Sequence, residues 1–150
     1  MVSRVTTHLI PEAGMTPREV FDRMRERWTA GETVFDDDSL TEDVILEMPF
    51  AAPGRPGRIE GRAAVLAFVR AGHDGLPFRF DDCRALAVHD TTDPGTIVVE
   101  YELAATLTAT GVSAAAPFVG VLTVRKGRIA RWREYQNPLA VASALETAAS

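Results

Sequence analysis

Apolar residues recur at helical spacing near the start of the chain. The stretch Thr16–Glu19 has the form of a capping box with proline at the first helical position, and Phe21, Met24 and Trp28 follow three to four residues apart. Gly31 then interrupts the pattern. We therefore expect a helix from about residue 16 to residue 30, preceded by a flexible arm over residues 1–15 that shows no periodicity.

The middle of the chain predicts a short strand, a loop and a second helix. Residues Asp43–Met48 alternate apolar and polar side chains before Pro49, which is typical of a strand. The segment 49–61 is rich in proline and glycine and predicts a long loop without regular structure. A helix is expected over Arg62–Ala71, with Gly72 ending it.

The second half of the chain changes to a period of two residues, which indicates strands. Short turn sequences separate the runs, so the strands are expected to pair as antiparallel hairpins. The runs are Phe78–Val88, Thr96–Thr108, Ala115–Lys126 and Arg128–Gln136. Asn137 and Pro138 then begin a last helix that reaches about Glu146. The order of elements predicts one α+β domain over residues 16–150, with helices packed on one face of a bent sheet.

Composition narrows the class of protein. The chain has 150 residues, 46% of them hydrophobic, and a net charge of −5, which is opposite in sign to what nucleic acid or an anionic membrane surface attracts. The single cysteine, Cys83, forms no internal disulfide and no cysteine-rich zinc site. No apolar run is long enough for a membrane helix or a secretory signal. We expect a cytoplasmic protein without a bound metal.

Several short motifs occur in an order that resembles the SnoaL-like family. They are Glu47-Met48-Pro49 at a strand end, Gly61-Arg62 at a helix start, and Trp132-Arg133-Glu134-Tyr135 followed by Asn137-Pro138. That family shares a cone-shaped fold with nuclear transport factors and includes polyketide cyclases, with limonene-epoxide hydrolases and ketosteroid isomerases as relatives. The resemblance implies a strongly curved, mixed but mostly antiparallel sheet and about three helices around an apolar pocket. It also implies cofactor-free chemistry and a homodimer formed through the outer face of the sheet.

Strand alternation assigns side chains to the two faces of that sheet. Along the last strand, Trp132, Glu134 and Gln136 share one face, and Arg131 and Arg133 point the other way. We place the arginines outside, where they can approach the acidic side chains of the long strand at positions 100 and 102. The opposite choice would bury up to three carboxylates on one wall without a base.

Glu134 is the leading candidate for a catalytic group. It would be a nearly isolated carboxyl beside Trp132 in an apolar pocket, and desolvation favours the neutral form of a carboxyl, which suits a general acid or base. By resemblance, Glu134 stands where limonene-epoxide hydrolases place the aspartate that activates water and where phenazine-pathway relatives place a catalytic glutamate. The remaining alternative is a structural carboxylate bonded to the backbone or to an arginine.

The motifs of the relatives are only partly present. The arginine and second aspartate of the epoxide hydrolases fall on Tyr101 and Leu103, and their water-holding tyrosine and asparagine fall on Ile45 and Glu47. In ketosteroid isomerases the base directly precedes the strand-ending proline, a place taken here by Met48. Hydrolysis of epoxides by that triad is therefore disfavoured.

The other candidates have both a site role and a plainer alternative. Tyr101 could donate to a ligand oxygen or be an aromatic core residue, and His73 could relay a proton or be an exposed helix-end residue. Glu47 could belong to the pocket wall or to the solvent-facing surface. The residues expected to contact substrate are Trp132, Gln136, Glu47, Leu103, Phe118, Trp28, Met24 and Phe68.

These residues support a cofactor-free enzyme as the leading hypothesis. It would act on a hydrophobic, oxygenated, polyketide-like molecule by proton transfer that leads to cyclisation or isomerisation, with Glu134 as acid or base and Tyr101 as a donor to the developing oxyanion. The alternatives are an epoxide hydrolase-like activity, a pocket protein that binds an apolar metabolite without reaction, and a dimerising interaction module.

Overall fold

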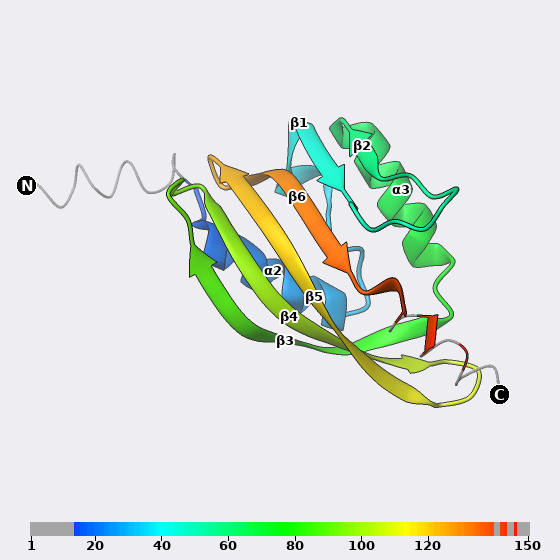
Figure 1. The fold of residues 1–150 in the computed structure, drawn as a ribbon. Helices are drawn as coiled ribbons and strands as arrows, with labels where there is room; N and C mark the ends of the chain where they lie inside the picture. Colours follow the sequence, from blue (N-terminus) through cyan, green and yellow to red (C-terminus); the bar gives the residue numbers. More distant parts are fainter. Residues whose placement is uncertain (1–13, 140–141, 144–145, 147–150) are drawn as a thin grey trace, which may run out of the picture.

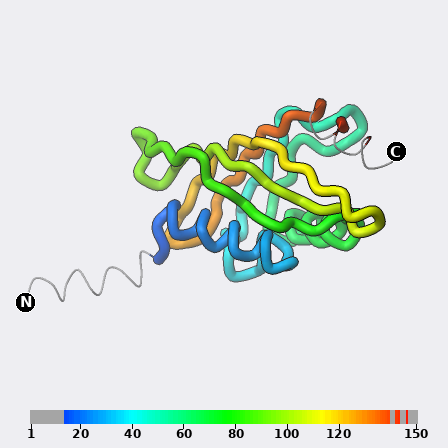
Figure 2. The backbone as a smooth tube through the Cα atoms, turned by 90° about the horizontal axis from the view of Figure 1, so that it is seen from below, coloured from blue at the N-terminus to red at the C-terminus, as the bar shows by residue number. Residues whose placement is uncertain are grey.

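One curved six-stranded sheet forms the body of the molecule, with two α-helices on the same side of it within the described residues (Figures 1 and 2). A computed structural model describes residues 14–139, 142, 143 and 146. The strands lie in the order β2-β1-β6-β5-β4-β3. In chain order the elements are α2 (Pro17–Thr29), a 3-10 helix (Asp37–Ser39), β1 (Leu40–Glu47), β2 (Arg58–Glu60), α3 (Arg62–Asp74), β3 (Phe78–Asp90), β4 (Thr96–Leu107), β5 (Ser113–Arg125) and β6 (Arg128–Gln136).

Helix α2 begins with the capping box that the sequence predicts. The Thr16 hydroxyl accepts a hydrogen bond from the Glu19 backbone N–H, and the Thr16 N–H donates to the Glu19 carboxylate at 3.0 Å. This exchange satisfies backbone donors that a helix start leaves unpaired. The buried face of the helix carries Phe21, Met24 and Trp28, as the periodicity predicts.

Several elements differ from the sequence-based expectation: β1 begins at Leu40 and not at Asp43, β5 begins at Ser113 and not at Ala115, and α3 and the loop before it differ more. Helix α3 continues through Gly72 to Asp74, and Gly75 is its C-cap. Glycine is only mildly unfavourable inside a helix, so its presence alone does not end one. The loop 49–61 was expected to lack regular structure, but its last residues form β2, which pairs antiparallel with β1. The prolines and glycines are concentrated before position 58, and the segment Arg58–Glu60 contains no residue that prevents pairing.

The topology confirms a mixed, mostly antiparallel sheet. Strand β1 runs parallel to β6, whereas the other neighbouring strands are antiparallel. The short turns predicted between the long strands are present, and Lys126 and Gly127 both adopt positive φ in the β5–β6 turn, as a two-residue hairpin of this kind requires. Of the third predicted helix, Asn137 to Glu146, the described residues Pro138, Leu139, Ala142, Ser143 and Glu146 are helical, and residues 140, 141, 144 and 145 lie outside the described residues, as do residues 1–13 of the expected arm.

The core lies between the concave face of the sheet and helix α2. Aromatic residues dominate it: the Tyr101 ring stacks against Trp28 on one side and Phe118 on the other, with centroid distances of 5.6 and 5.5 Å. Cys83 is buried in the same core, and burial raises the pKa of its thiol to about 11. Trp28 belongs to this core and also lines a pocket, so core and site share residues.

Candidate functional site

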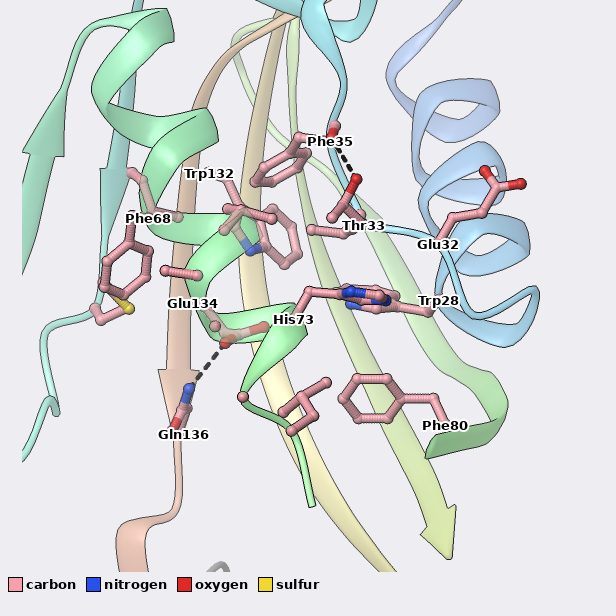
Figure 3. A pocket seen from close by; sticks show the side chains of 18 of the residues that line it. Trp28, Glu32, Thr33, Phe35, Phe68, His73, Phe80, Trp132, Glu134 and Gln136 are labelled. Carbon is pink, nitrogen blue, oxygen red and sulfur yellow. Dashed lines mark hydrogen bonds between the residues drawn. The ribbon is translucent and has the colours of Figure 1, made fainter. Parts of the chain in front are cut away.

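A pocket of about 650 Å³ opens between α3, the segment after α2 and the inner face of the sheet. Figure 3 shows aromatic side chains from several elements facing this space. Among the aromatic residues that line it are Trp28, Phe35, Phe68, Phe80 and Trp132. A volume of this size can enclose a drug-sized molecule, and an apolar wall with few polar groups is typical of a small-molecule site.

Strand β6 brings its inward-facing residues to the pocket as alternation predicts. Trp132, Glu134 and Gln136 all line the cavity. The indole of Trp132 lies directly over Gly120 on β5, where a Cβ atom would come within 2.0 Å of the ring. Only glycine leaves room for the ring, so this position determines how Trp132 forms the pocket wall.

The Glu134 carboxylate is held by neutral hydrogen-bond donors. Its Oε2 accepts from the Tyr101 hydroxyl at 2.5 Å, and its Oε1 accepts from the Gln136 side-chain amide at 3.0 Å (Figure 3 shows the second bond). Within the described part of the chain, no arginine, lysine or histidine lies at ion-pair distance from it. Glu134 is therefore a pocket carboxylate without a neutralising cation.

Tyr101 lies behind Glu134 and is not among the residues that line the pocket. Its side chain is fully buried, and burial, followed by the nearby charge of Glu134, raises the pKa of the phenol well above its usual value. The phenol thus stays protonated and acts as a donor. Since its one proton points at Glu134, the expected donation to a ligand oxygen is not the arrangement seen here.

His73 lines the pocket from the last turn of α3. Its Nε2 lies 2.8 Å from the Gly31 carbonyl oxygen, and its Nδ1 lies 3.6 Å from the Asp74 carboxylate. The structure shows no bond between His73 and Glu134. The imidazole instead ties the end of α3 to the segment after α2, which forms one side of the pocket.

Glu47 lies on the opposite face of the sheet from the pocket. Its carboxylate contacts the guanidinium groups of Arg58 at 3.3 Å, Arg131 at 3.1 Å and Arg133 at 3.2 Å. The pKa of Arg133 is raised, because its interactions with Tyr135 and Glu47 outweigh the lowering effect of burial. Glu47 is thus placed to link three strands rather than to contact a substrate.

The outward placement of the arginines agrees with strand alternation, but their expected partners were wrong. Arg131 and Arg133 meet Glu47 because β1, and not β4, lies beside β6. Strand β5 separates them from Glu100 and Glu102. Those two acids pair instead across the β3–β4 ladder, with His89 and Arg84 respectively.

The remaining expected contact residues divide into two layers. Trp28, Trp132, Gln136 and Phe68 line the pocket. Met24, Leu103 and Phe118 belong to the packed layer behind the wall, and the lining described here does not include them. Phe35, Phe80 and Glu32 also line the cavity but were not anticipated. Alternation could have indicated Phe80, whereas nothing in the local pattern marks Phe35 or Glu32.

The described residues contain no helix long and apolar enough to span a membrane. In the same part of the chain, no three histidine, cysteine or acidic side chains gather in a way that could hold a metal ion.

Comparison with known proteins places this geometry in a family. The model of the SnoaL-like domain matches residues 21–132. An uncharacterized PhzA/B-like protein of Pseudomonas aeruginosa is 34% identical over 102 residues, covering 68% of this chain and 70% of that protein. The uncharacterized protein YesE of Bacillus subtilis is 31% identical over 103 residues, which cover 69% of each chain.

Solved structures share the fold. A candidate isomerase from Bacillus subtilis aligns with a TM-score of 0.76 and 25% identity, covering 87% of this chain and 92% of that one. A Δ5-3-ketosteroid isomerase from Mycobacterium aligns with a TM-score of 0.66 and 22% identity, covering 84% and 97%. The curved sheet, the aromatic pocket and the family match over most of the chain lead to one conclusion: this protein belongs to the SnoaL-like domain family.

Proposed function

We propose that this protein is a cofactor-independent enzyme that moves a proton on an apolar, oxygenated small molecule and thereby cyclises or isomerises it. The observation that carries the proposal is Glu134: a carboxylate on an aromatic pocket wall, held by two neutral donors and neutralised by no cation. A carboxylate in this setting can accept a proton from carbon, because Tyr101 and Gln136 hold its orientation and no cation competes for its charge.

The proposed step is a proton transfer next to a carbonyl group. Glu134 takes a proton from the carbon beside the carbonyl, which leaves an enolate, and returns it at another carbon or after ring closure. Gln136 is placed to assist, because one of its two amide N–H groups binds Glu134 and the other remains as a donor for a ligand oxygen. The fold relatives include a ketosteroid isomerase and candidate polyketide cyclases, which is consistent with this reaction class.

Isotope exchange tests the proposal without knowledge of the natural substrate. We would incubate the protein in D₂O with 2-tetralone, a bicyclic aromatic ketone with acidic α-hydrogens, and follow loss of those hydrogens by proton NMR. We expect exchange above the buffer rate, reduced about 10²–10⁴-fold by Glu134→Gln. Glu32→Gln is the matched control, since Glu32 also lines the pocket but pairs with Arg27. Equal rates for wild type and Glu134→Gln would refute the proposal.

A binding protein without catalysis is the second candidate. Both Glu134 oxygens already accept hydrogen bonds, and the His73 ring is engaged with Gly31 and Asp74, so His73 is not placed as a second proton-transfer group beside Glu134. In that case Glu134→Gln would leave ligand affinity within a few-fold, and a co-purified ligand would be recovered unmodified. Epoxide hydrolysis has less support, because Tyr101 and Leu103 are buried where the hydrolases place charged groups.

A homodimer in the cytoplasm remains part of the proposal. The outer face of β5 presents Val119 and Val121, which are only partly buried and lie beside Tyr135 and Arg133 of β6. A second copy could cover these side chains. Sedimentation equilibrium would show a dimer that Val121→Glu dissociates, whereas a monomeric wild-type protein would contradict the prediction.

A further inference from the structure

The charged side chains that line the pocket differ in whether a group of opposite charge contacts them. Glu32 pairs with Arg27 at 3.2 Å, and Glu134 accepts from neutral donors. Arg55 also lines the pocket, and its guanidinium has no hydrogen-bond or ion-pair partner among the described residues. The wall therefore carries one positive group that nothing in the described structure balances.

The backbone of Arg55 is held in place by its own sequence. The Arg55 N–H donates to the Ala52 carbonyl at 3.0 Å, which closes a tight turn. Pro53 and Gly54, with φ at +85°, occupy the two central positions, as a type II turn requires. The Met48 N–H donates to the Gly57 carbonyl at 2.8 Å and closes the base of the loop. This turn fixes the backbone of Arg55 beside the pocket. The position of the backbone therefore does not depend on a partner for the side chain.

The two neighbouring arginines, Arg58 and Arg62, differ from Arg55 because each of them forms ion pairs with acidic side chains. Arg58 contacts both Glu47 and Glu60, and Arg62 contacts Glu42. Neither of these two arginines belongs to the pocket lining described above. The arginine that faces the cavity is thus the one in this segment whose charge is left for a ligand.

We propose that Arg55 binds an acidic group of the natural ligand, so that the substrate is an apolar, ring-bearing monoanion such as a carboxylic acid. This inference rests on the proposed function for the reacting end of the molecule, which lies at Glu134. A guanidinium binds a carboxylate through two parallel hydrogen bonds, whereas the negative charge of Glu134 repels an anion. The two wall charges therefore orient the ligand, with its acidic end at the loop and its neutral, enolisable part at Glu134.

A pair of fluorescent probes separates the contribution of the acidic group from that of the apolar body. The probes are 8-anilino-1-naphthalenesulfonate and N-phenyl-1-naphthylamine, which share an aromatic framework and differ in the sulfonate. Because Arg55 is exposed, we expect Arg55→Gln to weaken binding of the sulfonate by at most about five-fold, the upper end for an exposed ion pair, and to leave binding of the neutral probe unchanged. Added sodium chloride should weaken sulfonate binding to the wild type and have little effect on the variant.

Arg23→Gln is the matched control, because Arg23 is an exposed arginine on α2 that the pocket lining does not include. It should leave both affinities unchanged. The inference is overturned if Arg55→Gln affects both probes alike, affects neither, or if Arg23→Gln reproduces its effect. The assay needs no turnover, so a loss of the Arg55 effect with normal 2-tetralone exchange removes only this inference. Normal probe discrimination without exchange removes only the proposed reaction.

Discussion

Two glutamates on neighbouring strands have opposite surroundings. Glu47 ends β1 on the outer face and contacts three arginines, while Glu134 lies on the inner face of β6 and contacts a phenol and an amide. Both side chains are partly buried, and the strands that carry them, β1 and β6, are parallel neighbours in the sheet. The same type of side chain thus has two different environments in one sheet.

The difference shows how neighbours decide what a carboxylate can do. Three guanidinium groups contact the Glu47 carboxylate, and these ion pairs link β2, β1 and β6. The donors around Glu134 orient it but carry no positive charge, so its negative charge remains available to a proton or a ligand. Residue type alone therefore does not distinguish a structural acid from a catalytic one in this chain.

The largest expected effect compares the same substitution at the two sites. Glu134→Gln should lower the 2-tetralone exchange rate about 10²–10⁴-fold, because the amide cannot accept the proton. Glu47→Gln should leave the exchange rate of the folded protein within a few-fold, because Glu47 faces away from the pocket. Rates measured by NMR under conditions where both variants are folded decide the point, and equal losses at the two sites would remove the distinction.

The second expected effect reverses the comparison and concerns stability. Glu47→Gln should lower the free energy of unfolding by about 1–3 kcal/mol, because it leaves the partly buried Arg131 and Arg133, and the exposed Arg58, near one another without a carboxylate. Urea unfolding followed by circular dichroism measures this. Glu60→Gln is the control, since Glu60 is exposed and contacts only Arg58 of the three. A loss at position 60 as large as that at position 47 would contradict the assigned role.

A smaller effect is expected from the donor behind Glu134. Tyr101→Phe keeps the ring between Trp28 and Phe118 but removes the hydrogen bond, and it should cost about 1 kcal/mol of stability. Because the hydroxyl orients Glu134 and does not touch the ligand, the rate constant for exchange should fall about ten-fold with little change in the KM for 2-tetralone. Tyr135→Phe on the outer face, away from the pocket, should leave the rate constant and the KM for exchange unchanged. A rise in KM alone would indicate direct contact with the ligand.

The smallest expected effect is a pH dependence of stability that arises from the buried residues Cys83 and Tyr101. Burial is the main cause that raises the pKa of Cys83 to about 11 and the pKa of Tyr101 well above its usual value, so the folded protein keeps both protons when the unfolded chain begins to lose them. Their contribution to stability is complete below pH 9 and decreases as the pH rises toward 11. Urea unfolding across this range should show a shallower decrease for Cys83→Ala. An identical decrease would exclude Cys83 as a contributor.

Strand alternation predicted the most important feature of the site. A period of two residues along β6 correctly separates Trp132, Glu134 and Gln136 from Arg131 and Arg133. The capping box likewise predicted helix α2. These features depend on residues close together in the chain, and local backbone geometry determines them.

Features that depend on distant strands could not be predicted in the same way. The partner of the outer arginines follows from β1 lying beside β6, which no local pattern reveals. The same holds for the Tyr101 hydroxyl, which reaches Glu134 across the intervening strand β5. Strand β2 was not predicted, because its three residues directly follow a segment rich in proline and glycine. Phe35 was not predicted as a pocket residue, because its segment shows no periodicity.

The parallel pairing of β1 with β6 also has a consequence for how the protein forms during synthesis. The contact between Glu47 and Arg133 joins residues 86 positions apart, and β1 and β5 are not connected in the sheet until β6 inserts between them. Contacts of such long range slow folding, because a large loop must close before they form. Strand β6 carries both the pocket residues Trp132, Glu134 and Gln136 and the arginines that pair with Glu47 on the outer face. A nascent chain therefore cannot complete this pocket or this sheet until β6 has left the ribosome.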